Sequence, residues 1–311
     1  MSYSFLRESK LYIVHGGTKY RIYTTSAIAI NQTFAEDSYS VKTLHDQSKM
    51  FEGTSITKAN PASFSFNVPL TLEKDESIVV TLATELDTSS DSGITTQQLK
   101  SFDIYIQTGS STYKLAGAVI TSATFDFVPE NQFQIRVEGQ GKQLTRAGDE
   151  SFSIPGSAQS ESATRTPLIV YPHLTLNSLN MSSILSCNIT FQNNIEWTPY
   201  ETLHESLDVT GPSDAMFPTA YTLGNRIASG EIRQYQTDNN VTQFDDFMTS
   251  TNLIIKAFQV GKPSDGTPFF QLELNPVMFT SRLQVADVFT QSYDFSSLDN
   301  TVLENRITQY S

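Results

Sequence analysis

Apolar and polar residues alternate with a period of two along much of this chain, and no other feature of the sequence constrains the fold as strongly. Residues 64–72, "FSFNVPLTL", place apolar side chains at alternate positions, and residues 102–106, "FDIYI", and 133–139, "FQIRVEG", repeat the pattern. Successive side chains of a β-strand point to opposite faces, so this period predicts half-buried strands. The 20 Phe and 13 Tyr residues also favour sheets. We therefore expect a mainly β protein.

A four-residue phrase occurs twice in the chain. Thr-Leu-His followed by an acid stands at residues 43–46 and again, 159 residues later, at 202–205. With the same offset, "IAINQTFAEDSYSVKTLHD" (28–46) aligns without a gap to "CNITFQNNIEWTPYETLHE" (187–205). Further along, "YKLAGAVITSATF" from Tyr113 resembles "FQLELNPVMFTSRL" from Phe270. The phrase is either a ligand or catalytic motif, or the trace of a duplicated domain.

The length and the linker composition favour duplication. A chain of 311 residues can hold two domains of ordinary size. The segment between the copies is rich in Ser, Gly, Ala and Thr, which is typical of a linker. We predict a first module over residues 1–148, a linker over 149–166 and a second module over 167–311. Each module is predicted to contain one short helix, at residues 92–100 and at 241–248, the latter opening with a capping box.

The charge balance excludes tight nucleic-acid binding. The net charge is −13, and residues 1–150 hold 13 Lys/Arg against 17 Asp/Glu while residues 151–311 hold 7 against 16. Affinity for phosphates comes from Lys and Arg, which release counterions, so an acidic chain does not adhere to DNA. The segment "MSYSFLRESK" carries charges where a secretory signal needs an apolar core, and no run of 18 apolar residues follows it. We expect a protein made in a cytoplasm, without membrane insertion.

No residue constellation for catalysis is found in the sequence. His45 and His204 each precede an acid, but neighbouring residues of a strand point to opposite faces, which argues against a shared metal site. The single Cys187 excludes an internal disulfide framework and a cysteine-rich zinc site. The "HGG" at residues 15–17 has no accompanying nucleophile motif and is better explained as a hairpin turn. We expect no catalytic residues, no metal, no cofactor and no enzymatic activity.

Two β-rich copies, each with a long polar excursion before its strand pairs, resemble the tail tube proteins of long-tailed bacteriophages. That fold is shared with the tube proteins of contractile injection and type VI secretion machines. The resemblance is carried by residues 34–70, "FAEDSYSVKTLHDQSKMFEGTSITKANPASFSFNVPL", followed by the strands between 102 and 137. It implies two tandem tube-type β-sandwich or barrel modules, each with one short α-helix and a long inter-ring loop, which residues 35–62 form in the first module.

The resemblance also implies self-assembly. Its members form rings that stack into a hollow conduit for DNA passage, and a chain with two modules completes a six-module ring as a pseudo-hexameric trimer; six chains per ring is the alternative. Further expected partners are the tape-measure, sheath, terminator and baseplate or hub proteins, with transient, non-adhesive passage of DNA. The expected location is the tail of the virion, assembled in the host cytoplasm. The residues expected at inter-subunit contacts are Tyr39, Thr43, Leu44, His45, Asp46, Phe51, Trp197, Thr202, Leu203, His204 and Glu205.

Other functions stay open on the sequence alone. A tail hub, initiator or terminator, or a capsid-associated β-sandwich protein, differs from a major tail tube protein in copy number rather than in fold. The aromatic content is also compatible with a carbohydrate-binding β-sandwich module. The acidic balance favours a conduit, because a lumen of like charge repels DNA.

Overall fold

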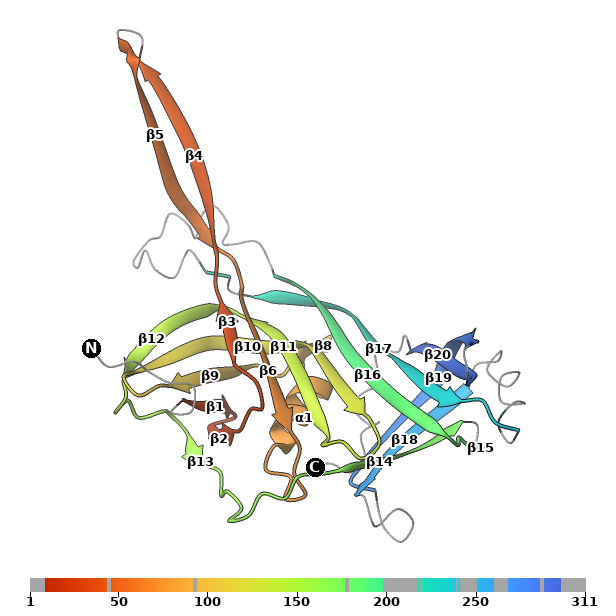
Figure 1. Cartoon of the computed structure of the whole chain (residues 1–311). Coiled ribbons are helices and arrows are strands. Elements are labelled where there is room, and N and C mark those ends of the chain that lie inside the picture. Colours follow the sequence, from red (N-terminus) through yellow and green to blue (C-terminus); the bar gives the residue numbers. More distant parts are fainter. Residues whose placement is uncertain are drawn as a thin grey trace.

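The computed structural model describes residues 9–43, 46–91, 94–176, 179–197, 217–218, 220–238, 240, 251–259, 268–285 and 288–297. The first half contains β1 (Lys10–His15), β2 (Thr18–Ile22), β3 (Ala29–Asn31), β4 (Phe34–Thr43), β5 (Asp46–Ala59), β6 (Ala62–Pro69), α1 (Ser77–Thr84), β7 (Leu86–Asp91), β8 (Ile94–Leu99), β9 (Phe102–Gln107), β10 (Ser111–Phe127), β11 (Gln134–Gly141) and β12 (Gln143–Asp149). The second half contains β13 (Ser157–Ala158), β14 (Val170–Leu176), β15 (Leu179–Asn180), β16 (Ile184–Trp197), β17 (Tyr221–Tyr235), β18 (Thr251–Gln259), β19 (Phe270–Gln284) and β20 (Thr290–Ser297). The prediction of a mainly β fold is confirmed (Figure 1).

The two halves pair their strands in the same order. The first half runs β2-β1-β9-β10-β11-β6-β3, and the second runs β15-β14-β18-β19-β20-β17-β16. Every neighbouring pair in both series is antiparallel. Each strand of the first series therefore has a counterpart at the same place in the second. Among the described residues, α1, β12, β13 and the β4–β5 and β7–β8 hairpins lie outside this shared series.

One equivalent cross-strand pair shows how each half fills the same space. Phe64 on β6 lies opposite Gly139 on β11, and at the corresponding place Gly230 on β17 lies opposite Phe295 on β20. A Cβ added at Gly139 would meet the Phe64 ring at 2.3 Å, and one added at Gly230 would meet the Phe295 ring at 2.6 Å. Each half thus places one phenylalanine ring over one glycine, with the two residues exchanged between the strands. The glycine is required because a close-packed interior has no room for a second side chain.

A strand junction joins the two halves into one sheet. β10 pairs antiparallel with β16 from Ser122 opposite Gln192 to Phe127 opposite Cys187. Sixteen of the described strands consequently belong to a single sheet, and the buried apolar residues of both halves form one core. The strands with the predicted period-two pattern, β6, β9 and β11, turn alternate side chains toward that core.

The prediction of a helix at residues 92–100 is wrong. Ile94–Leu99 forms strand β8, which pairs with β7, because its Ile and two Thr residues are β-branched and fit an extended chain. The first-half helix is instead α1, whose sequence "SIVVTLAT" buries six of its eight residues and so lacks the polar face that marks an amphipathic helix. The second predicted helix, residues 241–248, lies outside the described residues.

The segment predicted as a linker is tied to the first half. Ser157 and Ala158 pair parallel with β2, and the backbone and side chain of Thr166 donate hydrogen bonds of 2.8 and 2.7 Å to Glu73. Arg165 donates to the buried Glu76 at 2.9 Å and stacks 3.5 Å from the centre of the Tyr23 ring. These contacts fix the path by which the chain reaches the second half.

Candidate assembly interface

A long β-hairpin projects from the body of the molecule. β4 and β5 pair from Phe34 opposite Ala59 to Thr43 opposite Asp46, and Figure 1 shows the two strands standing away from the sheet. The 14 residues of β5 would extend about 45 Å at roughly 3.3 Å per residue. The segment predicted as a long inter-ring loop is therefore a hairpin. A two-stranded ribbon this long has no core of its own and is stable only with further support.

Four of the residues predicted at subunit contacts lie on this hairpin. Tyr39 pairs with Gly53, Phe51 pairs with Val41, and Thr43 pairs with Asp46 near the tip. Leu44, His45 and residues 202–205 lie outside the described residues. The first and last residues of the repeated phrase in its first copy, Thr43 and Asp46, therefore form the last described pair of the hairpin.

Trp197 lies where the two halves of one chain meet. Its indole Nε1 donates a 2.6 Å hydrogen bond to Gln140 Oε1, and its ring packs edge-on against Tyr221 at 5.4 Å. With Tyr221 it packs on a small buried cluster formed by Leu86, Leu99 and Val119. In a single chain this tryptophan thus stabilises the contact between the halves, and its prediction as an inter-subunit residue stays a prediction.

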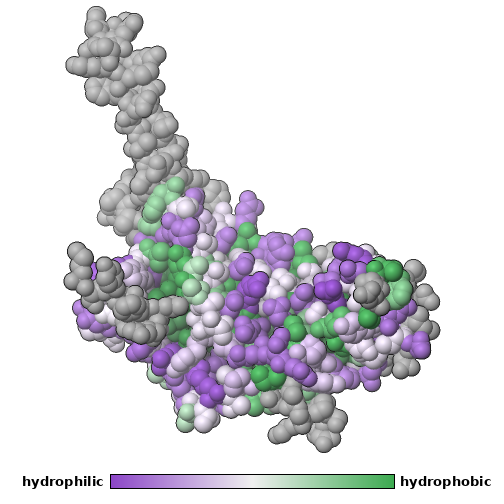
Figure 2. All heavy atoms as spheres, in the orientation of Figure 1, coloured by the Kyte–Doolittle hydropathy of each residue, from purple (hydrophilic) through white to green (hydrophobic). Residues whose placement is uncertain are grey.

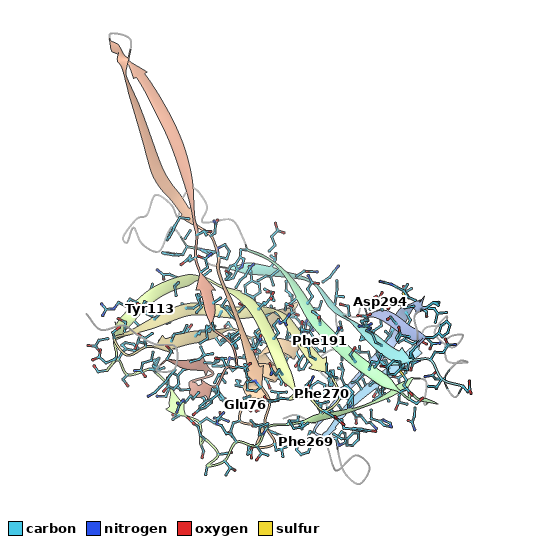
Figure 3. All side chains as sticks on the ribbon, viewed as in Figure 1. Glu76, Tyr113, Phe191, Phe269, Phe270 and Asp294 are labelled. Atoms are coloured by element: carbon cyan, nitrogen blue, oxygen red, sulfur yellow. The ribbon has the colours of Figure 1, made fainter. Side chains whose placement is uncertain are left out.

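The junction between the halves is an aromatic core. The ring centre of Phe125 on β10 lies 5.5 Å from that of Phe191 on β16 and 5.3 Å from that of Phe270 on β19. Phe127 and Phe133 also lie within 5.6 Å of Phe270. Figure 3 shows Phe191 and Phe270 in the middle of the body, whereas Tyr113 and Asp294 lie toward its opposite ends. Packing of this kind, rather than the hydrogen bonds alone, holds the halves together.

Polar contacts support the same junction. Asn193 donates to the Ile120 carbonyl at 2.9 Å, and the buried Arg226 donates to Asn193 Oδ1 at 2.8 Å and to the Thr84 carbonyl at 2.7 Å. Burial raises the pKa of Asp126, which lies opposite Asn188 in the β10–β16 ladder. Sequence reasoning missed these residues, because a single Asn or Arg inside an alternating segment has no pattern that marks it as buried.

The free end of the second half exposes apolar side chains. Leu283 is 49% exposed, Val285 69% and Phe289 45%, although such residues are usually interior. β18 pairs with β19 only as far as Val277, so among the described residues no strand lies beside the edge of Thr280–Gln284 that faces away from β20. Long, exposed, apolar strand edges invite pairing with another chain.

A second edge is exposed at the other side of the molecule. β3 pairs only with β6 among the described strands, and a groove of about 520 Å³ opens along it, lined partly by Ile28 and Ile30. Both isoleucines are only partly buried against the core. Figure 2 shows apolar side chains gathered beneath the hairpin and again toward the end that carries β19 and β20. Within the described part of the chain, these two separate edges are suited to strand addition.

Neither a metal centre nor a membrane helix is found in the described part of the chain. No three His, Cys, Asp or Glu side chains gather there closely enough to hold a metal ion. No helix among the described residues has the length and apolar character needed to span a bilayer.

Comparison with known proteins gives one match that covers almost the whole chain. The family model of the Bacteriophage Baseplate Tube Protein Family matches residues 1–307. No individual curated protein matches the chain.

Proposed function

This chain belongs to the bacteriophage baseplate tube protein family, and on that premise we propose that it is a duplicated tube protein whose copies close into a ring around a channel for DNA. A structural tail or baseplate tube role, and a place in the virion, follow from the family itself. The duplication is supported by one observation above all: the two halves have the same antiparallel pairing order over seven strands each.

Three chains per ring is the arrangement that we favour. Two equivalent modules per chain supply six modules in a trimer, which is threefold symmetric and sixfold only approximately. Six chains per ring, with the second modules outside or in a second layer, is the alternative.

The conduit part of the proposal has electrostatic support. The chain carries 33 acidic against 20 basic residues, and a lumen lined by excess acid repels DNA instead of binding it. Lumen-facing acids replaced by Lys should slow DNA delivery without preventing ring assembly. Unchanged delivery by such variants would contradict this part of the proposal.

The position along the tail is a separate proposal. The family description names the baseplate, which favours a ring at the baseplate end of the tube over the many stacked copies of a major tail tube protein. In this position the chain would contact tape-measure, hub and tube proteins, with the β4–β5 hairpin reaching the next ring. We infer no enzymatic activity.

Electron microscopy of the purified protein, with symmetry taken from end-on views, tests the proposed ring. Hollow rings of three chains are expected, and a protein that stays monomeric at high concentration would contradict the proposal. Quantitative mass spectrometry of whole virions then separates the two positions, because a baseplate ring contributes a few copies and a major tube protein contributes many.

A further inference from the structure

The exposed edge of β19 corresponds to the edge of β10 that binds the second half within the chain. Phe64, Gly139 and Ile120 lie opposite one another on β6, β11 and β10, and Gly230, Phe295 and Phe279 do so on β17, β20 and β19. These two rows occupy the same place in the shared pairing order. Ile120 on β10 is therefore equivalent to Phe279 on β19.

The equivalence continues along both strands. β10 has an irregularity between Ile120 and Ser122 that β19 lacks, and beyond it Phe125 lies opposite Ile135 as Leu283 lies opposite Gln291. Ile135 in turn lies opposite Val68 on β6, and Gln291 lies opposite Gln234 on β17. Val68 and Gln234 occupy the same place on their strands, because they follow the equivalent residues Phe66 and Ile232 by two positions. Phe125 is thus equivalent to Leu283, and Phe127 to Val285.

A pair of backbone hydrogen bonds gives the third equivalent position independently. The Leu70 N–H donates to the Phe133 carbonyl at 2.9 Å, and the Gln236 N–H donates to the Phe289 carbonyl at 2.9 Å. Leu70 and Gln236 follow β6 and β17 at the same distance along the shared register. Phe133 is therefore equivalent to Phe289.

Burial differs sharply between these equivalent residues. Phe125, Phe127 and Phe133 are fully buried because the second half covers them. Their counterparts Leu283, Val285 and Phe289 are exposed, and no described strand covers this edge of β19. All three exposed positions nevertheless carry apolar side chains, as the buried positions of the first half do.

The complementary edge is β3. In the internal junction β16 lies beside β10, with Ile189 opposite Phe125 and Cys187 opposite Phe127. β3 is the counterpart of β16, and the 159-residue offset equates Ile30 with Ile189 and Ile28 with Cys187. These two isoleucines point to the same side as the buried residues of β16 but are only partly covered.

We propose that residues 280–285 of one chain pair antiparallel with residues 28–33 of a second copy, with Leu283 opposite Ile30 and Val285 opposite Ile28. The register copies the internal β10–β16 ladder step by step. This inference rests on the proposed function, whose ring it provides with a specific contact. The two edges of the proposed contact differ, so neighbouring chains join head-to-tail. A ring closes when the rotation that relates neighbouring chains is a whole fraction of 360°.

An aromatic residue completes the match. Sequence alignment equates Tyr113 with Phe270, the ring that covers Phe125, Phe127 and Phe133 in the internal junction. Tyr113 is 42% exposed and lies toward the end of the body in Figure 3. In the assembled ring it covers Leu283 and Val285 of the neighbouring chain. A second copy is favoured over an unrelated partner because the chain itself already contains both sides of this contact.

Engineered cysteines test the proposed register directly. In an Ile30→Cys/Leu283→Cys variant, the two thiols of adjacent chains lie on directly opposite residues, close enough for a disulfide or a short bismaleimide to link them. Non-reducing gels should show linked species of two and three chains and none larger. The matched control is Ala29→Cys/Leu283→Cys, in which the first thiol lies on the other face of β3 and no link is expected. Cys187 is buried, so it stays in place in both variants.

Electron microscopy of the same samples separates this inference from the proposed function. Rings together with the cross-link support both, whereas rings without the cross-link overturn the β19–β3 contact and leave the ring standing. A cross-link without closed rings supports the contact and contradicts the ring. The absence of both rings and cross-links at high protein concentration would overturn both proposals. As a second variant, Leu283→Lys should fold, because its side chain is exposed in the monomer, but should lose assembly; normal rings of this variant would contradict the contact.

Discussion

The contrast between equivalent buried and exposed positions leads to a quantitative prediction for the monomer. Phe125→Ala removes a fully buried ring that contacts Phe133, Phe191 and Phe270, and truncations of this kind lower the free energy of unfolding by about 3–5 kcal/mol. Leu283→Ala truncates a side chain that is 49% exposed, so it should lower monomer stability by less than about 1 kcal/mol. The two substitutions are made at positions that we consider equivalent in the two halves.

The order of the two effects should be reversed for assembly, where Leu283→Ala should have the larger effect on the contact between chains. Complete burial of a leucine is worth about 1.5–3 kcal/mol, so covering the exposed half of Leu283 contributes about 1 kcal/mol to each contact between chains. Leu283→Ala should therefore weaken each contact by about fivefold, where tenfold corresponds to 1.4 kcal/mol. A ring that needs all its contacts is weakened more than a single contact.

The assay is urea unfolding of dilute monomer, followed by Trp197 fluorescence and by far-ultraviolet circular dichroism. Trp197 is the single tryptophan and lies at the junction, so its fluorescence reports on the contact between the halves. If the halves share one core, the two signals change together in one transition. Separate transitions, or a Phe125→Ala effect below about 1 kcal/mol, would refute the reasoning that the junction is a core.

Four further substitutions or deletions test other parts of the structure. Gly230→Ala places a Cβ 2.0 Å from a backbone oxygen and should destabilise the chain by about 1–3 kcal/mol in urea unfolding; an unchanged midpoint would contradict the close packing described. Arg165→Met leaves the buried Glu76 without its cation and should lower the free energy of unfolding by about 2–4 kcal/mol. Proteolysis between residues 150 and 167 should be faster than in the natural chain, and equal cleavage rates would contradict the attachment of this segment to the first half. Burial raises the pKa of Asp126 above its ordinary 3.8, so the stability linked to this group is full below that pH and is lost as the pH rises through the raised pKa. Asp126→Asn should consequently be more stable than the natural chain between pH 4 and 7, by an amount that changes with pH. A difference in the free energy of unfolding that stays constant across this range would contradict the link between stability and the ionisation of Asp126. Replacing residues 36–57 by a tight turn should preserve single rings and abolish their attachment to the next ring of the tube, and unchanged attachment of this variant would remove the hairpin from the contact between rings.

Periodicity in the sequence was sufficient to predict the strand content and several individual strands. The alternation in residues 64–72, 102–106 and 133–139 corresponds to β6, β9 and β11, and the Gly16–Gly17 turn joins β1 and β2. Alternation is informative there because one face of each strand meets the core and the other does not. It fails for α1, which is buried on nearly all sides and therefore shows no helical period.

The candidate assembly interface was only partly predictable from the sequence. The repeated phrase lies at the tip of the hairpin at residues 34–59, and its role in contacts between subunits stays a prediction. The exposed edge at Leu283 and Val285 was missed, since an apolar residue in a strand looks the same whether its own chain or a neighbour covers it. Only the comparison of burial at equivalent positions distinguishes the two cases.

The most direct test of the account is the number of chains in a closed ring, measured by native mass spectrometry of the assembled protein and checked by end-on electron microscopy. The account predicts a mass three times that of the 34.6 kDa chain, with threefold views that are nearly sixfold. A closed ring of six chains, or one in which a different edge joins the subunits, would contradict it.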